Sequence, residues 1–393
     1  MKEILVITNS YPNASNMNSG IFVHEQLKVA KDYGYSITVI NPVFEFPFLS
    51  QGGMPSYKNS DHIDGIDIYY PKYVLIPKKM GYNFTVNSYI KAVINCYYSE
   101  NINKPDLIHS HWATPAGIAG VELANMLSIP LLTTLRGSDI YTYPNKSKKA
   151  KEYTNTVLKS SEKVFCVSEA LKNKVKEDYN LDVNLDVLYN GIDIDSFVKN
   201  EKSVQAIKDT LKFNEKEKII LFVGRLIKEK GVWELVKSIE VLSKNEKNIR
   251  LIMIGNGKEQ KSLKKYVEKN GLGKYIHFPG KVPYKELKDW YNASEILVLP
   301  SYSEGLPNVV VEALGCETAV IATDVGGNGE IINEKNGILI PVKDIKSIVS
   351  SVSSLLNNEE IRISMGIEGR KFVEKKFNRG KNVEKLVEIY GKL

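Results

Sequence analysis

Short apolar runs alternate with amphipathic stretches along the whole chain. In the first half, runs rich in Val, Ile and Leu predict strands at residues 3–8, 36–41, 106–109, 130–135, 163–167 and 186–188. Apolar positions at helical spacing predict helices near residues 21–33, 83–98, 115–127, 148–159 and 169–179. This alternation is typical of a doubly wound parallel sheet covered by helices on both faces.

One segment of the first half interrupts this alternation. Residues 44–77 contain Gly, Pro and many aromatic residues, among them Tyr69, Tyr70 and Tyr73. The pattern predicts a long loop, and loops of that length are usually functional or mobile.

The second half repeats the alternation without repeating the residues. Strands are predicted at 218–223, 249–254, 275–278, 296–299, 319–322 and 337–340, and helices near 232–244, 258–270, 285–291, 309–315 and 345–356. The charged stretch 198–216 is predicted to connect two domains, and two amphipathic helices are predicted at 359–375 and 381–391. We therefore predict domains at 1–190 and 191–375, followed by a C-terminal helical segment at 376–393.

Composition supports two ordinary globular domains. The chain has 393 residues, of which 43% are hydrophobic and 25% charged, so each half can bury its own core. We expect no membrane span, because no apolar run reaches the roughly 18 residues required. The N-terminus resembles a first strand, not a signal peptide. The three cysteines lie far apart without metal-ligand spacing, which favours a reduced, cytoplasmic setting.

The net charge of +7 is spread over lysines along predicted helices. Most of these lysines are explained by positions on the solvent-exposed surface of the protein. No nucleic-acid-binding signature accompanies the basic residues, so we expect no nucleic-acid partner. A basic surface also favours anionic ligands and contact with an anionic membrane.

The clearest candidate site lies between Glu304 and Glu312. Glu304 follows the predicted strand 296–299, where open α/β sheets bind their ligands, and Glu312 lies inside the next predicted helix. Two glutamates eight positions apart also occur by chance in charged helices. The setting makes the pair specific: Gly305, Leu306, Pro307 and Asn308 follow the first glutamate, and Thr-Asp-Val-Gly-Gly follows the next strand.

A second candidate follows the strand 218–223. Gly224 allows close approach of a ligand to the backbone, and Arg225 and Lys230 bring two cations beside the start of a helix. Such an arrangement suits a diphosphate, although a turn with solvated charges has the same composition. Gly255 and Gly257 form a Gly-x-Gly turn after the next strand, and Lys281 with Val282 follows the strand after that; a plain tight turn explains the glycines equally well.

Polar residues also follow the strands of the first half. Gly20 lies between the first strand and the first helix, and either binds an anion through backbone amides or simply begins the helix. His109 and His111 lack a third metal ligand nearby, and packing is the favoured role of His109, whereas His111 is predicted to be more loop-like. Arg136 and Asp139 follow the fourth strand, and Asn190 precedes Gly191 in a turn.

These motifs together resemble the retaining glycosyltransferases of family 4. The resemblance rests on Glu304-Gly-Leu-Pro-Asn with Glu312, Gly224-Arg225 with Lys230-Gly231, and Asn190-Gly191-Ile192-Asp193. It implies the GT-B fold, in which two Rossmann-like doubly wound domains face a central cleft. The acceptor would then belong to the first domain and the nucleotide-sugar to the second, and the last helix would cross back to the first domain.

The resemblance also implies individual roles. Glu304, Arg225 and Lys230 would serve the transferred sugar and its departing diphosphate, and Glu312 the ribose. Arg136 stands where the family has a histidine facing the reacting sugar; an arginine cannot act as a base but can stabilise charge, unless it is merely a capping or surface residue. Asp139 is predicted to hold the Arg136 guanidinium through paired hydrogen bonds. Donor contacts are implied for Gly20, Gly224, Gly255, Gly257, Lys281, Val282, Gly305, Leu306, Pro307 and Asn308, and acceptor-side roles for His111, Asp139 and Asn190.

The expected activity is transfer of a hexosyl unit, with retention, from a nucleotide-sugar (a UDP-sugar foremost) to a lipid-linked or glycan acceptor, as in surface polysaccharide synthesis. We expect neither a cofactor nor a metal, because the chain offers no Asp-x-Asp loop. The expected location is the cytoplasm or the inner membrane face. A non-catalytic sugar-nucleotide or glycan-binding relative remains the alternative, and an epimerase of the same fold is a third, less supported one.

Overall fold

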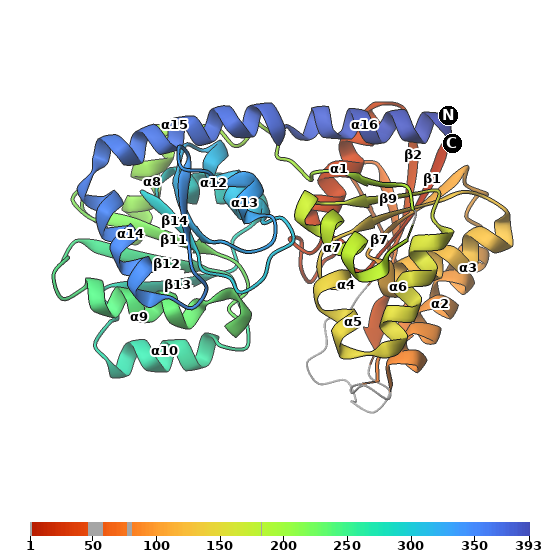
Figure 1. Ribbon diagram of the computed structural model, residues 1–393, viewed down its shortest axis with the longest axis horizontal. Helices are drawn as coiled ribbons and strands as arrows, with labels where there is room; N and C mark the ends of the chain where they lie inside the picture. Colours follow the sequence, from red (N-terminus) through yellow and green to blue (C-terminus); the bar gives the residue numbers. More distant parts are fainter. Residues whose placement is uncertain (1, 46–57, 77–80, 182) are drawn as a thin grey trace. The chain divides into compact units, whose positions relative to one another are not determined.

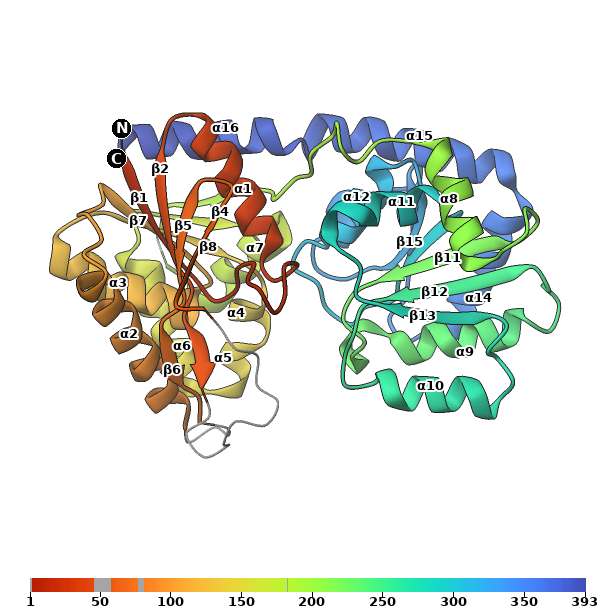
Figure 2. The same ribbon diagram turned by 180° about the vertical axis from the view of Figure 1, so that it is seen from behind.

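The protein is described by a computed structural model that covers residues 2–45, 58–76, 81–181 and 183–393 (Figures 1 and 2). The chain forms two compact units. The N-terminal unit comprises residues 1–190 together with 380–393, and the C-terminal unit comprises residues 191–379.

An eight-stranded sheet forms the centre of the N-terminal unit, and all its strands but β4 pair in parallel. In spatial order the strands are β10 (Leu185–Val187), β9 (Lys163–Cys166), β8 (Leu131–Leu135), β7 (Leu107–His111), β1 (Glu3–Thr8), β2 (Ser36–Ile40), β5 (Ile66–Tyr69) and β4 (Ser60–Ile63). A separate parallel pair is formed by β3 (Val43–Glu45) and β6 (Lys72–Val74).

Helices cover both faces of this sheet (Figure 1). One face packs on α1 (Ile21–Asp32) and α16 (Arg379–Lys392), whose Val383, Leu386 and Tyr390 lie in the same core cluster as Ile4 and Val6 of β1. On the other face α2 (Tyr82–Ser99), α3 (Ile118–Leu127) and α6 (Lys148–Ser160) pack against one another. The remaining helices are α4 (Ser138–Tyr141), α5 (Tyr143–Lys146), α7 (Glu169–Tyr179) and a π-type turn at Ala113–Gly117.

The C-terminal unit contains a six-stranded parallel sheet of buried apolar strands. Its order is β13 (Ile276–Gly280), β12 (Ile249–Ile254), β11 (Lys218–Val223), β14 (Ile296–Leu299), β15 (Ala319–Thr323) and β16 (Gly337–Ile340). Figure 2 shows α9 (Val232–Leu242), α10 (Gln260–Lys269) and α14 (Ile345–Asn357) on one side. The other side carries α8 (Glu201–Leu211), α11 (Leu287–Asn292), α12 (Asn308–Gly315) and α15 (Glu359–Lys376); α13 (Asn328–Ile331) and short 3-10 turns at Lys228–Lys230 and Tyr284–Glu286 complete the unit.

Each sheet has a point where the strand order reverses. In the N-terminal sheet it lies between β1 and β7, and in the C-terminal sheet between β11 and β14. Ligands of open α/β sheets bind outside the carboxyl ends of the strands at such a point. The loops after these four strands are therefore where a site is expected.

The prediction of a loop at 44–77 was wrong, and the segment 198–216, predicted to connect the domains, contains a helix that the sequence analysis missed. The predicted loop 44–77 contains β4, β5 and β6, and β5 pairs with β2; residues 46–57 and 77 lie outside the described part. The predicted connection 198–216 contains helix α8, which packs on α11. The strands β4, β5 and β6 have only three or four residues each, and the surface helix α8 has many charged residues, so the local pattern of apolar positions is weak in both segments.

Candidate active site

Two of the predicted residues in the C-terminal unit form an ion pair. Lys230 Nζ lies 2.5 Å from Glu304 Oε1. Lys230 comes from the 3-10 turn after β11, and Glu304 from the loop after β14, so the contact bridges the two strands at the reversal point. The Glu304 side chain is 9% exposed and that of Lys230 is 21% exposed, which leaves the pair shielded but within reach of a ligand.

The glycines after β11 and β12 bring two loops together. Gly255 has a φ of +127°, and a Cβ there would lie 1.9 Å from the carbonyl oxygen of Gly224. A Cβ at Gly257 would lie 2.2 Å from the carbonyl oxygen of Leu226. Both glycines are therefore required by the chain itself, and they place the two strand ends side by side.

Arg225 lies in the loop that follows β11. Its side chain is exposed and makes no hydrogen bond or ion pair within the described ranges, although its carbonyl oxygen accepts from the amide of Ile227. A long cation held at a strand end without a partner is available for a ligand.

The loop that carries Glu304 is supported from behind by the turn after β15. Gly326 has a φ of +51°, and a Cβ there would lie 1.9 Å from the carbonyl oxygen of Glu304. The amide of Gly327 donates to the carbonyl oxygen of Gly305 at 3.0 Å. The sequence motif Thr-Asp-Val-Gly-Gly thus has a defined role, which is to fix the position of Glu304.

Glu312 is more deeply buried than Glu304 and Lys230. It is 3% exposed, and its Oε2 accepts a hydrogen bond from the Tyr291 hydroxyl at 2.6 Å. Burial raises the pKa of Glu312 from 4.5 to about 7, although the Tyr291 hydrogen bond and Arg379 act in the opposite direction. The sequence analysis did not predict a role for Tyr291, because no local pattern links it to Glu312, which lies 21 residues further along the chain.

The other predicted donor contacts lie in the loops after β12, β13 and β14 of the same sheet. Leu306 and Pro307 are buried, Gly305 and Asn308 are partly buried, and α12 begins at Asn308 without a side-chain cap. Gly280, which precedes Lys281, accepts from the amide of Gly255 at 2.7 Å. Lys281 is exposed and Val282 is buried.

Arg136 forms the centre of a polar cluster in the N-terminal unit. Its guanidinium donates to Asn190 Oδ1, to His111 Nδ1 at 2.5 Å and to Gln26 Oε1 at 3.3 Å, and it lies 5.0 Å from the centre of the Phe22 ring. These contacts bring Arg136, His111 and Asn190 together. Gln26 and Phe22 of α1 were missed, since they lie more than 100 residues away in the sequence.

Two predictions about this cluster were wrong. Asp139 does not hold the guanidinium: its carboxylate accepts instead from the backbone amides of Ala113, Arg136 and Gly137. His111 is not loop-like but ends β7 and is 0% exposed, because β7 extends beyond its apolar part to pair with Thr134 of β8. A short carboxylate satisfies nearby amides more readily than a distant side chain.

His109 and Gly20 of the N-terminal unit have contacts that explain them structurally. His109 is buried and bonded to the Tyr390 hydroxyl at 2.6 Å and to Thr134 Oγ1 at 2.8 Å, in agreement with a packing role. Gly20 begins α1, and a Cβ there would lie 2.0 Å from the carbonyl oxygen of Ser10. The helix entry therefore requires a glycine at position 20.

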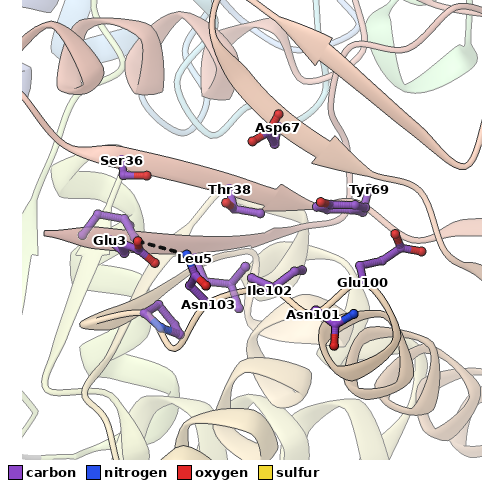
Figure 3. Close-up of a pocket in the computed structure, with 12 residues that line it drawn as sticks. Glu3, Leu5, Ser36, Thr38, Asp67, Tyr69, Glu100, Asn101, Ile102 and Asn103 are labelled. Carbon is purple, nitrogen blue, oxygen red and sulfur yellow. Dashed lines mark hydrogen bonds between the residues drawn. The ribbon is translucent and has the colours of Figure 1, made fainter. Parts of the chain in front are cut away.

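A hollow of about 200 Å³ in the N-terminal unit contains none of the predicted site residues (Figure 3). It is lined by the first residues of β1, by Thr38, Asp67 and Tyr69, and by the segment from Glu100 after α2. Glu3 to Leu5 lie at the amino end of β1, opposite to the edge where sheets of this kind bind ligands.

Within the described ranges, no group of three or more His, Cys, Asp or Glu side chains is placed to hold a metal ion. In the same part of the chain, no helix combines the length and apolar character that crossing a membrane requires.

Comparison with known proteins gives the family. Residues 203–372 match the model for glycosyl transferases group 1, and residues 20–196 match the model for glycosyltransferase family 4. The chain is 36% identical to the glycosyltransferase MJ1178 of Methanocaldococcus jannaschii, over 81% of this chain and 83% of that protein. The chain belongs to the family 4 glycosyltransferases.

Two further comparisons agree with this assignment. The glycosyltransferase is 29% identical to the putative teichuronic acid biosynthesis glycosyltransferase TuaC of Bacillus subtilis, over 99% of this chain and 98% of TuaC. Its fold matches that of Anabaena HepE, solved with UDP-glucose, with a TM-score of 0.78 at 16% identity and coverage of 100% of both chains. The fold is GT-B, with a Rossmann-like sheet in each unit, and the protein is a transferase enzyme.

Proposed function

We propose that this glycosyltransferase moves a hexosyl unit from a UDP-sugar to a lipid-linked or glycan acceptor, with retention, in surface polysaccharide synthesis. The observation that carries the proposal is the Lys230–Glu304 ion pair at the reversal point of the C-terminal sheet. Arg225 follows the same strand, and its exposed side chain has no polar partner in the described part of the chain. In this proposal the C-terminal unit binds the donor and the N-terminal unit the acceptor.

The chemistry at this site needs stabilisation of charge. When the bond between the anomeric carbon and the diphosphate oxygen breaks, negative charge develops on the departing diphosphate. Arg225 and Lys230 are preorganised cations for that charge, and the uncapped start of α12 adds backbone amides. Glu304 orients Lys230 and accepts from hydroxyls of the transferred sugar.

The nucleoside is assigned to neighbouring groups. Glu312 Oε2 is held by Tyr291, which leaves Oε1 for the ribose hydroxyls. The backbone around Lys281 and Val282 is assigned to the base, and the close-packed turns at Gly224 and Gly255 to the backbone side of the diphosphate. Two side-chain cations replace the charge of a metal ion, so the proposed reaction requires no divalent metal.

The names of similar proteins support the class of substrate. TuaC is named for teichuronic acid biosynthesis, and HepE was solved with UDP-glucose. A non-catalytic binding protein is the alternative, but the similar proteins are named as glycosyltransferases or synthases, which favours an enzyme.

A thermal-shift panel tests the donor assignment. UDP-, GDP- and ADP-glucose are each added in excess EDTA, and the UDP compound should raise the melting temperature most, because a ligand that binds only the folded state stabilises it. The shift should disappear in Arg225→Ala and persist in Lys228→Ala, which removes an exposed lysine from the same segment. A shift that appears only when Mg²⁺ or Mn²⁺ replaces the chelator would contradict the metal-free proposal.

A further inference from the structure

Among the residues that the structure describes, the hydrogen-bond acceptors of the Arg136 guanidinium are all neutral. The side chains that accept from it are an amide (Asn190), an imidazole (His111) and a second amide (Gln26), and its flat face lies near the Phe22 ring. The carboxylate of Asp139 accepts from three backbone amides and acts on the guanidinium only through space. A buried cation is usually paired with an anion, whereas Arg136 forms no ion pair within residues 2–45, 58–76, 81–181 and 183–393.

Two N–H groups of the same cluster are left without acceptors. Arg136 Nε and His111 Nε2 are buried and have no hydrogen-bond partner in the described part of the chain. His111 Nδ1 accepts from Arg136, so the ring proton of the neutral imidazole must lie on Nε2, which is therefore a donor. Burial and the charge of Arg136 hold the pKa of His111 well below its usual value, which keeps this tautomer neutral.

Burial of the charge is costly. Burial lowers the pKa of Arg136 from 12.5 to about 9, whereas Asp139 and Tyr390 act to raise it. At this pKa the side chain is still charged at neutral pH. Arg136 is partly exposed, unlike the 0% exposed His111 behind it. An oxyanion that reaches Arg136 from solvent would neutralise the charge and provide acceptors for unmet donors.

The position in the fold suits a substrate group. Arg136 follows β8 directly, and His111 ends β7, one of the two strands at the reversal point of the N-terminal sheet. Trp112 comes next with a φ of +72°, an uncommon value for a bulky residue of the kind that occurs at functional sites.

We propose that Arg136, held by His111, Asn190 and Gln26, forms an oxyanion subsite of the N-terminal unit that selects a substrate carrying a carboxylate or a phosphate. The proposal rests on the proposed glycosyl transfer and specifies its substrate class. Two sources share this chemistry: a uronic acid unit of a sugar, and the phosphate of a phosphate-linked acceptor.

The ring nitrogens of histidine report on this subsite directly. The chain has five histidines, and ¹⁵N labelling of the folded full-length protein allows His111 to be followed while inorganic phosphate or acetate is added. We expect a saturable shift of the His111 ring signals and none for the exposed His62. The exchange of Nε2 protons should slow when an acceptor is present.

Matched pairs of ligands then identify which substrate group binds at Arg136. UDP-glucuronic acid is compared with UDP-glucose, and N-acetylglucosamine 1-phosphate with N-acetylglucosamine. In one of the two pairs, the member with the additional carboxylate or phosphate should shift His111, and its binding should be weakened about 10-fold or more in Arg136→Gln, which corresponds to about 1.4 kcal/mol. The member without that additional group should bind the parent and Arg136→Gln equally. Lys149→Gln, which removes an exposed charge from the same unit, should behave like the parent.

Arg136→Lys keeps the charge without the planar fork and should bind the anion with intermediate affinity, so the proposal can be tested even if the glutamine variant does not fold. Three results would overturn the proposal. The His111 signals do not shift with any ligand, they shift only with phosphate or acetate, or the shift persists in Arg136→Gln. If UDP binds normally while His111 remains unchanged, only the subsite is refuted; a protein that binds no nucleotide refutes the proposed function instead.

Discussion

Lys230 and Glu304 lie 74 residues apart in the sequence and 2.5 Å apart in the structure. The sequence indicated both residues, because each follows a buried strand in a distinctive motif. It could not indicate their contact, which depends on β11 and β14 being neighbours in the sheet. The Arg136 cluster illustrates the same limit: Gln26, on the first helix, has no local feature that distinguishes it from a surface glutamine.

Glu312 provides a prediction at the residue scale. Its pKa is about 7 in the folded protein against 4.5 in the unfolded chain, so the folded state holds the proton more tightly. Stability from this group is therefore complete below pH 4.5 and is lost as the pH rises to about 7. Glu312→Gln should be increasingly favoured over the parent across that window, by at most about 3 kcal/mol, since one pKa unit corresponds to about 1.4 kcal/mol.

Urea unfolding of both proteins between pH 4 and pH 8 measures this difference. The slope against pH matters, because the amide has its own effect on Tyr291 at every pH. A difference in unfolding free energy that does not change with pH would show that folding leaves the pKa of Glu312 unchanged, which would contradict the prediction.

At the scale of elements, most strands of both sheets could be predicted within one or two residues. Central parallel strands are covered on both faces and therefore appear as nearly continuous apolar runs. The errors occurred where this signal is absent: β4 is an edge strand with partly exposed residues, and α8 lies on the surface with many charges. β7 was predicted too short because its last residues, Ser110 and His111, are polar yet buried.

The turn after β15 provides a prediction for an element. Gly326→Ala introduces a Cβ that would lie 1.9 Å from the Glu304 carbonyl oxygen, at a φ of +51° that costs a non-glycine residue about 1–2 kcal/mol. The loop must move, and turnover should fall about 10-fold or more while the protein remains folded. Gly273→Ala meets no atom within 4 Å and serves as the control. Parent-like turnover in Gly326→Ala would mean that the position of Glu304 does not depend on this turn.

At the scale of the whole molecule, the net charge of +7 and the expected lipid-linked acceptor support a proposal of peripheral contact with an anionic membrane at its cytoplasmic face. Flotation with vesicles tests it. The protein should float with anionic vesicles at low salt, and high salt or neutral lipid should release it, because surface charges are screened over about 8 Å at physiological ionic strength. Binding that is indifferent to lipid charge and salt would contradict an electrostatic contact.

The turnover of Arg225→Ala compared with Lys228→Ala tests the central claim most directly. Both residues are exposed cations in one segment after β11, so each change removes one positive charge with little effect on folding. We expect Arg225→Ala to lose turnover by a factor on the order of 100, the scale for one electrostatic stabiliser, and Lys228→Ala to match the parent at an unchanged melting temperature. Equal turnover of the two variants would contradict the assignment of this strand end to the departing diphosphate.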